Sequence, residues 1–278
     1  MATNGTASYM SYSFKAKKPP RENLHKIAQS QVFLATSELA ELPDEKAVHQ
    51  VRKRCKKMRA LLRLIRYKAD GLYRYENAQF RILANTLSGS RDAVSLRDAL
   101  LKLAPAKYPQ IEAFLVQRAE YKSDEQALED ATLQLQQAAQ RIEEWPLRSL
   151  RWKHARKGYV KGYRRARKAM KEAFAEDSPE RFHEFRKRVK DHWYQSRLLA
   201  ERHRTRVGRR QKPLKKLAKA LGDWRDLHLL CTFLAPKSDQ FSGELIALLD
   251  CANSRSDELR QEIECLAGAL FDSKRFEW

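Results

Sequence analysis

The stretch HQVRKRCKKMRALLRLIR, residues 49–66, contains eight Lys or Arg residues and no Asp or Glu. Its apolar residues still recur at the three- and four-residue spacing of one helix face. Like charges four positions apart repel each other along a helix by about 0.2–0.5 kcal/mol per pair, so most surface helices mix both signs. The stretch therefore predicts a helix that packs through one edge and presents a row of cations beside that edge.

The basic residues of this helix follow a regular 3,4,3,4,3 spacing, which places them on a single stripe. This first row consists of His49, Arg52, Lys56, Arg59, Arg63 and Arg66. A parallel apolar stripe consists of Val48, Val51, Cys55, Met58, Leu62 and Ile65. A single run of Lys and Arg on a helix is usually only a solvated surface, but further copies of the pattern argue against that interpretation here.

The same pattern returns 134 positions later in the chain. Identical residues with this offset are His49 and His183, Arg52 and Arg186, Lys53 and Lys187, Arg54 and Arg188, Lys56 and Lys190, and Arg63 and Arg197. We call His183, Arg186, Lys190 and Arg197 the second row. Two predicted N-cap residues, Asp44 and Ser178, and the pairs Arg91–Asp92 and Arg225–Asp226 keep the same offset. One offset shared by separate motifs predicts two copies of one helical unit, residues 11–145 and 146–278.

A third basic segment, RSLRWKHARKGYVKGYRRARKAMK at 148–171, contains eleven Lys or Arg residues and no acid. Its row again has the 3,4,3,4,3 spacing and consists of His154, Lys157, Lys161, Arg164, Lys168 and Lys171. Gly162 within this segment predicts close approach of another backbone. Because rows beside packing edges converge when helices pack together, we expect a cationic groove or channel between the two units.

The positions of proline and the absence of strand alternation predict an all-α fold with about eight to twelve helices. With 42% hydrophobic residues the chain can bury a substantial core. The helix of the first row is expected to start after Asp44 and to end near Gly71. Residues 111–145 and 239–271 have mixed charge and are expected to form ordinary bundle helices.

The formal net charge of +21 arises from 56 Lys or Arg and 35 Asp or Glu residues. Such a charge favours nucleic acid, an anionic membrane surface or another polyanion as the partner. No apolar run approaches the ~18 residues that span a bilayer, and the first residues contain no secretory apolar region. The cysteines, which are Cys55, Cys231, Cys251 and Cys265, lack zinc-site spacing, so we expect reduced thiols, no metal and no cofactor.

Three motifs resemble the CHAD family, the conserved-histidine α-helical domains: HxxRxxxKKxRxxxR at 49–63, HEFRKRVKDHWYQSRLL at 183–199 and LGDWRDLHLL at 221–230. The resemblance covers the chain from about residue 11 to its end. It implies two four-helix bundles related by a pseudo-twofold axis around a basic central pore. It also implies a module that binds inorganic polyphosphate and has no catalytic activity of its own. Some members are fused to a triphosphate-tunnel domain, and because the ExExK signature of that domain is absent here, we expect a stand-alone module.

The resemblance also implies which residues contact polyphosphate. The matching positions are His49, Arg52, Lys56, Lys57, Arg59 and Arg63 in the first motif, and His183, Arg186, Lys187, Lys190 and Arg197 in the second. To these the residue pattern adds Lys53 and the third-row members His154, Lys157, Lys161, Arg164 and Lys168. Trp193 departs from the family's pattern, in which an Arg is common at that position.

Other interpretations of the same residues stay open at this point. A nucleic-acid-binding protein is the main alternative, and weaker, salt-sensitive binding to RNA is expected in any case. A phosphoryl-transfer enzyme is disfavoured because the rows lack carboxylates to hold Mg²⁺ and no Walker motif is present. Each motif histidine, His49 or His183, is a core residue, a phosphate contact or, as the weakest option, a metal ligand, and a role as phospho-acceptor stays open. We expect a cytoplasmic protein, associated with polyphosphate granules or another polyphosphate-rich compartment.

Overall fold

The computed structural model describes residues 12–88, 91–119 and 124–278, without the side chains of Arg91, Asp92 and Ser242. Within these ranges the chain forms ten α-helices, two short 3₁₀ helices and no β-strand, so the predicted all-α fold is confirmed. The helices are α1 (Pro20–Glu41), α2 (Asp44–Ile65), α3 (Asp70–Thr86), α4 (Arg91–Leu103), α5 (Pro109–Arg118), α6 (Glu125–Glu143), α7 (Trp152–Glu176), α8 (Pro179–Leu199), η1 (Gly208–Arg210), α9 (Gln211–Leu234), η2 (Ala235–Lys237) and α10 (Ser242–Phe271).

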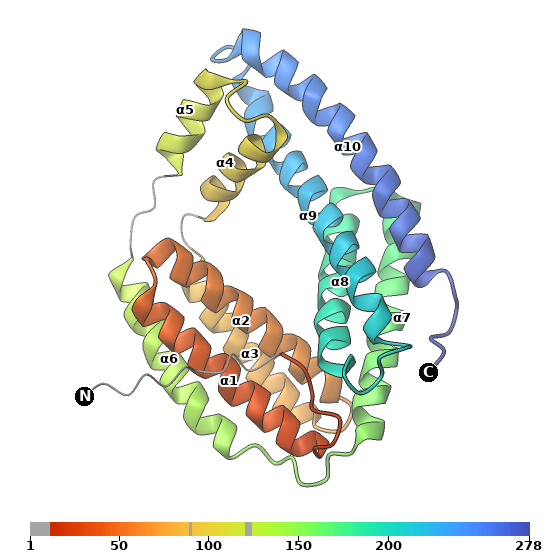
Figure 1. Ribbon diagram of the computed structural model, residues 1–278. Helices are drawn as coiled ribbons and strands as arrows, with labels where there is room; N and C mark the ends of the chain where they lie inside the picture. The colour runs from red at the N-terminus through yellow and green to blue at the C-terminus, as the bar shows by residue number, and fades with distance from the viewer. Residues whose placement is uncertain (1–11, 89–90, 120–123) are drawn as a thin grey trace, which may run out of the picture.

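The helices α1, α2, α3 and α6 pack against one another around one hydrophobic core (Figure 1). The predicted apolar stripe of α2 faces this core, since Val51, Cys55, Met58, Leu62 and Ile65 are each at most 2% exposed. Burying a side chain of this size stabilises the fold by about 1.5–3 kcal/mol. The stripe therefore fixes which face of α2 turns inward, and the cations of the first row are left at its margin.

The helices α7, α8, α9 and α10 form a second packed group (Figure 1). The apolar stripe of α8 begins with Phe182, Phe185 and Val189, which are buried in the core of this group. Leu199, at the end of the same helix, is buried in the core of the first group. Thus α8 belongs to both cores and ties the two groups together.

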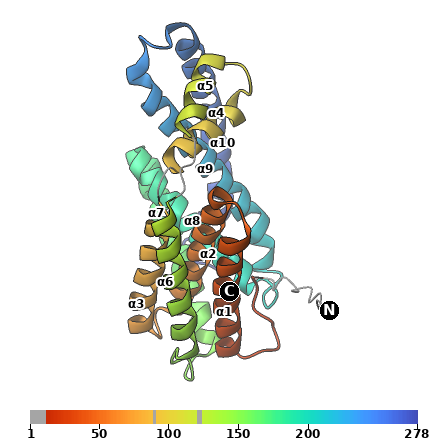
Figure 2. The same cartoon turned by 90° about the vertical axis from the view of Figure 1, so that its left-hand side faces the viewer.

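The helices α4 and α5 leave the first group and pack against α9 and α10 (Figures 1 and 2). Their buried residues Leu100, Ile111 and Leu115 share one core with Leu230 and Leu248. Residues from the N-terminal half of the chain therefore cover the far end of the C-terminal half. The division of the chain between residues 145 and 146 stays a prediction.

The helices α2 and α8 contact each other through their C-terminal halves. Arg63 Nη1 lies 3.0 Å from Asp191 Oδ1, and Gln195 Nε2 donates a hydrogen bond of 3.4 Å to the carbonyl oxygen of Ala60. From this contact the two helices diverge toward α4, so that the ribbons of α2, α8, α9 and α4 surround an open space in Figure 1. The first and second rows are carried by two of the helices that border this space.

The structure corrects two predicted boundaries of α2. The helix begins at Asp44, with Pro43 rather than Asp44 at the N-cap position. It ends at Ile65 rather than near Gly71, because the backbone N–H groups of Lys68 and Ala69 both donate to the carbonyl oxygen of Ile65. The N-cap of α8 is confirmed, since Ser178 Oγ accepts a 3.3 Å hydrogen bond from the backbone N–H of Arg181.

The predicted close backbone approach on α7 occurs one turn before Gly162. A Cβ atom on Gly158 would overlap the carbonyl oxygen of Leu64, so the backbones of α7 and α2 touch at this point. At Gly162 the neighbour is a side chain, because a Cβ there would overlap Gln195 Oε1. The two glycines let α7 lie directly against both α2 and α8.

Candidate anion-binding site

The first row lies along α2 between α3 and α8. The guanidinium of Arg52 donates to the carbonyl oxygens of Ala84 and Leu87, the latter at 2.8 Å. A cation at the C-terminal end of a helix stabilises it through the helix dipole, so Arg52 also anchors the end of α3. Arg59 Nε donates a 3.1 Å hydrogen bond to Asn77 Oδ1 on the same neighbouring helix.

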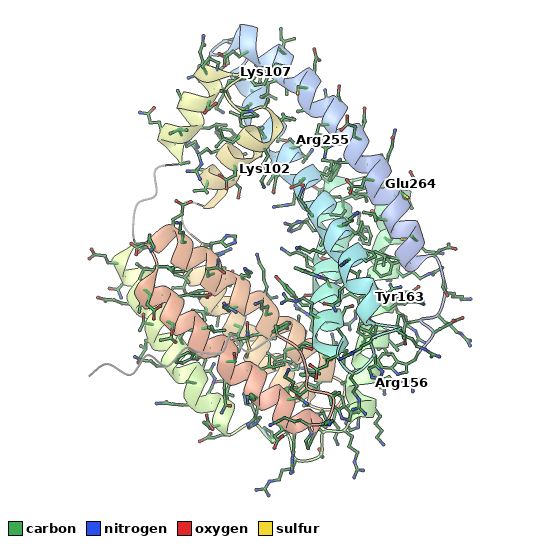
Figure 3. All side chains as sticks on the ribbon, in the orientation of Figure 1. Lys102, Lys107, Arg156, Tyr163, Arg255 and Glu264 are labelled. Carbon is green, nitrogen blue, oxygen red and sulfur yellow. The ribbon has the colours of Figure 1, made fainter. Side chains whose placement is uncertain are left out.

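Of the remaining first-motif residues, His49 is exposed and Lys56 is half-buried. Lys53 is also half-buried and donates a 3.2 Å hydrogen bond to Gln50 Oε1. These side chains lie on the N-terminal half of α2, which borders the open space between the ribbons. Figure 3 shows nitrogen-tipped side chains reaching from α2, α8 and α9 toward that space.

The second row lies against α9 and close to α4. Arg186 packs at Gly222 of α9, where a Cβ atom would lie 3.3 Å from Arg186 Nη2. Burial raises the pKa of Asp226 on α9, while the positive charges of Arg186 and of Lys102 on α4 oppose this rise (Figure 3). Charged side chains from α4, α8 and α9 therefore meet at one point. Lys187 is exposed and lies 3.6 Å from Glu184.

His183 is held neutral at pH 7. Burial, followed by the positive charge of Arg225, lowers the pKa of its imidazole to about 4. Its Nδ1 atom is buried and has no hydrogen-bond partner among the residues that the structure describes. A neutral imidazole can act on a phosphate only as an N–H donor, and it adds no positive charge to the row.

Lys190 of the second motif is half-buried on α8, and Lys57 and Arg197 lie together on the α1 side of the α2–α8 contact. Lys57 is only 6% exposed, and its Nζ and the Cζ of Arg197 lie 5.3 and 5.4 Å from the ring centroid of Tyr12. Burial, followed by the charges of Arg54 and Arg197, lowers the pKa of Lys57 to about 7. Lys57 and Arg197 therefore both take part in packing between the helix groups. They lie away from the exposed end of the rows.

The third row divides into parts with different surroundings. His154 Nδ1 accepts a 3.1 Å hydrogen bond from the backbone N–H of Arg151 and so caps the start of α7. Lys157 and Lys161 point toward the ring of Tyr67, just beyond the end of α2. Arg164 and Lys168 are exposed, and Lys168 lies 3.4 Å from Glu172. Only the middle of the third row thus meets the first row.

Several charged residues near the rows were missed by the sequence analysis. Arg165 lies beside Tyr67, and Arg188 lies 3.8 Å from Asp191. A search for cations at a constant four-residue spacing, starting from Lys157 and Lys161, would have identified Arg165. Lys102 had no local signal, because only tertiary packing brings α4 to α9.

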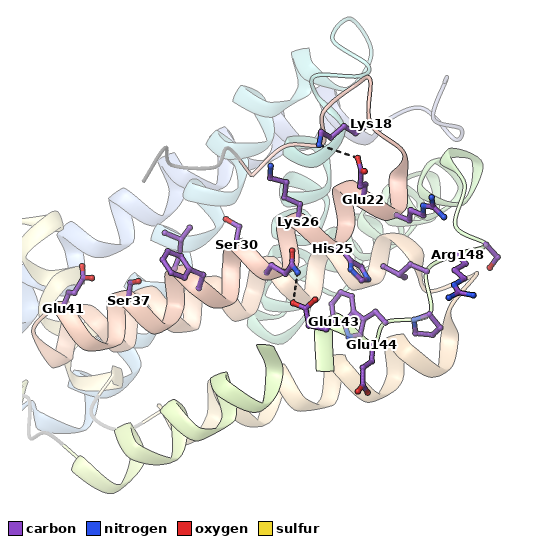
Figure 4. A pocket seen from close by; sticks show the side chains of 18 residues that line it. Lys18, Glu22, His25, Lys26, Ser30, Ser37, Glu41, Glu143, Glu144 and Arg148 are labelled. Carbon is purple, nitrogen blue, oxygen red and sulfur yellow. Dashed lines mark hydrogen bonds and ion pairs between the residues drawn. The ribbon is translucent and has the colours of Figure 1, made fainter. Parts of the chain in front are cut away.

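A wide hollow lies elsewhere, between α1 and the end of α6 (Figure 4). Its charged lining is mixed and consists of Lys18, Arg21, Lys26, Arg148, Glu22, Glu41, Glu143 and Glu144. It contains no member of the three rows. Size alone therefore does not locate the anion site, and this hollow offers a charge-balanced surface for comparison.

The described residues show no metal site or disulfide. No group of three His, Cys, Asp or Glu side chains comes together there in a way that could hold a metal ion. All four cysteines have free thiols, and burial raises the pKa of Cys55 to about 12. None of the described helices is long and apolar enough to cross a membrane.

Residues 28–235, which include both motif helices, match the CHAD domain. The chain belongs to the CHAD domain family. Its structure is similar to the crystal structure of the CHAD domain from the plant Ricinus communis, with a TM-score of 0.64 and 17% sequence identity over 95% of this chain and 96% of that chain. None of the curated protein sequences matches this CHAD protein. The family resemblance and the CHAD fold are thus confirmed.

Proposed function

We propose that this CHAD domain binds inorganic polyphosphate along the first and second rows and does not transform it. In this proposal the two helix groups are related by a pseudo-twofold axis, and the space between α2, α8, α9 and α4 is a basic channel. The observation that carries the proposal is the placement of two equivalent cationic rows on two helices that diverge around one space (Figures 1 and 3). The net charge of +21 supports a polyanionic partner.

The chemistry of the rows suits a linear phosphate polymer. Arg forks and Lys point charges bind phosphate oxygens, and a polymer that spans many cations gains free energy by releasing its counterions. The second row supplies Arg186 and Lys190, and His183 offers an uncharged donor beside them. Repeated cations match a chain of repeated anions better than they match one small ligand.

The acids near the rows support binding without phosphoryl transfer. Phosphoryl transfer usually needs carboxylates that are available to hold Mg²⁺. Asp191 is bonded to Arg63, Glu184 is paired with Arg188 and lies near Lys187, and the charge of Arg186 acts on Asp226. These carboxylates already balance cations of the protein, which leaves the rows as a contact surface.

The test compares the rows with the charge-balanced hollow. The row variant Lys53→Gln, Lys56→Gln, Lys187→Gln and Lys190→Gln removes Lys56 and Lys190 of the rows together with Lys53 and Lys187 beside them, which are two pairs of charges equivalent in the repeat. The control variant Lys18→Gln, Arg21→Gln, Lys26→Gln and Arg148→Gln removes the same charge beside α1. Affinity for long-chain polyphosphate and for single-stranded RNA of matched charge is measured at about 50 and about 200 mM salt.

We expect the wild type and the control to keep polyphosphate at the higher salt while RNA dissociates, and the row variant to lose polyphosphate. If the row variant binds polyphosphate as tightly as the control does, the rows are not the site. Equal affinity of the wild type for RNA and polyphosphate at the higher salt would favour a nucleic-acid-binding protein instead. Phosphate release by the wild type in the presence of Mg²⁺ would contradict a purely binding role.

A further inference from the structure

Tyr67, the second residue after α2, is approached by four cations. Nζ of Lys161 and of Lys157 lie 5.2 and 5.9 Å from its ring centroid, and Cζ of Arg66 and of Arg165 lie at 5.5 and 6.0 Å. The three α7 cations stand four residues apart, so at ~1.5 Å per residue they form a ladder about 12 Å long. We call these four cations and Tyr67, which is 37% exposed, the Tyr67 cluster.

The positive charge of the Tyr67 cluster is not balanced by the described part of the chain. No described carboxylate forms an ion pair with any of its four cations. A small pocket next to Tyr67 has Asp191 as its one acidic lining residue, and Asp191 is already held by Arg63 and Arg188. Burial lowers the pKa of Arg165, and the nearby guanidinium groups act in the same direction. Such a concentration of charge attracts anions.

The Tyr67 cluster lies above a closely packed contact of α7 with α2 and α8. Gly158 and Gly162 line the pocket and allow α7 to touch α2 and α8, so the α7 cations are held at a fixed position beside Tyr67. Gln195, which is 2% exposed, also lines the pocket, and its Nε2 donates a 3.4 Å hydrogen bond to the carbonyl oxygen of Ala60 on α2. The lining of the pocket is therefore held in place by contacts between α2, α7 and α8.

The positions related to the cluster by the 134-residue repeat do not form a second cluster. The positions 134 residues before the three α7 cations are Asn23, Ile27 and Gln31 of α1, and all three are buried. The position that corresponds to Tyr67 is occupied by Glu201. The cluster is therefore a feature of one side of the molecule, in addition to the rows that both halves share.

The first row leads directly to the cluster. Its last two members are Arg63, which lines the pocket, and Arg66, which belongs to the cluster itself. We propose that the Tyr67 cluster is an additional phosphate-binding subsite, which takes the part of a long polyphosphate chain that extends past the end of α2. This proposal rests on the proposed function. A chain too short to span both surfaces fills only the rows, so the cluster acts on long chains alone.

The test uses two chain lengths and two variants of equal charge. The cluster variant is Lys157→Gln, Lys161→Gln and Arg165→Gln, and the control is Arg21→Gln, Lys26→Gln and Arg148→Gln. We expect the cluster variant to bind long-chain polyphosphate at least about tenfold more weakly than the control, with a salt-dependence slope smaller by about two. Affinity for tripolyphosphate should be the same in both variants. Equal affinity of both variants for the long chain would overturn the proposal.

Tyr67 is a positioning residue, and a conservative pair of variants tests this role. Tyr67→Phe keeps a ring for the cations and should bind long chains as the wild type does, whereas Tyr67→Leu should bind them a few-fold more weakly. Equal binding by these two variants would remove Tyr67 from the subsite. Circular dichroism and melting temperature confirm that each variant is folded. Failure of the proposed function is recognised separately, because in that case the row variant binds long-chain polyphosphate as tightly as the wild type does.

Discussion

The contact between α2 and α8 has two sides related by the sequence repeat, and the two sides carry different chemistry. On the α7 side, Arg63 pairs with Asp191 at 3.0 Å. The corresponding residues on the α1 side are Arg197 and Lys57, two cations that both lie against the ring of Tyr12. The repeat thus preserves the packing of the helices but not their charges. One side is held by an ion pair, and the other relies on burial and cation–π contacts.

The largest effect is expected from the backbone contact on the α7 side. Gly158 corresponds to Leu24 on the α1 side, so α1 carries a side chain at the position where α7 has none. Gly158→Ala should lower the free energy of unfolding by about 3 kcal/mol, because the overlapping atom is a carbonyl oxygen of Leu64 that cannot rotate away. Urea denaturation measures this change. Gly71→Ala is the control, since nothing lies within 4 Å of a Cβ there, and a loss at Gly158 no greater than the control's would contradict the close contact.

The ion pair on the α7 side is the next largest contribution. Asp191→Asn should lower the free energy of unfolding by about 2 kcal/mol, because the side chain of Arg63 is only 14% exposed and loses its charged acceptor. The control is Glu258→Gln, which removes an acid from an exposed pair with Arg255 and should cost under about 0.5 kcal/mol. Equal losses of the two variants in thermal or urea unfolding would show that the Arg63–Asp191 pair stabilises the fold no more than an exposed ion pair does.

Lys57 gives the α1 side a pH dependence in the alkaline range. Its pKa is about 7 in the folded protein against 10.5 for an ordinary Lys, so the unfolded chain binds the proton more strongly between these values. The stability of the wild type should therefore rise with pH from about 7 to about 10.5 through this group. Lys57→Met should be more stable than the wild type at pH 6, and this advantage should shrink as the pH rises above 7. If the difference in unfolding free energy between the two proteins stays constant across this pH range, the ammonium of Lys57 does not have a lowered pKa in the folded protein.

The two motif histidines provide the smallest and most local comparison. His49 is exposed, whereas His183 is half-buried beside Arg225 with a pKa of about 4. An NMR titration with His183→Gln as the assignment control should show the His183 signal changing only at low pH. Bound polyphosphate should raise this pKa, by about one unit for a stabilisation of about 1.4 kcal/mol, because nearby negative charge favours the imidazolium. An unchanged His183 titration in the complex would place the phosphates away from this end of α8.

The helices with apolar stripes were predictable, and the placement of α4 and α5 was not. Burial of the stripe that begins at Val51 follows from local periodicity alone. By contrast, the continuous helix α9 covers positions that the first half of the chain divides between α3 and α4. The contact that then holds α4, between residues such as Leu100 and Leu230, is distant in sequence and leaves no periodic signal.

For the candidate site, the sequence identified the stripes but not what each stripe faces. His154, Lys57 and Arg197 belong to the expected set, yet they cap a helix or pack against an aromatic ring. Arg165 was missed because the α7 cations near Tyr67 are spaced four residues apart throughout, whereas the predicted row alternates spacings of three and four residues. Which face of a helix meets a neighbour depends on the rotation of that helix in the packed fold, and spacing alone does not specify this rotation.

A crystal structure of the protein with bound long-chain polyphosphate tests the central claim most directly. We predict phosphate groups along the inner faces of α2 and α8, within hydrogen-bonding distance of Lys56 and Lys190, with the chain continuing past Arg66 to the Tyr67 cluster. Phosphates bound in the hollow between α1 and α6, with both rows unoccupied, would contradict the account.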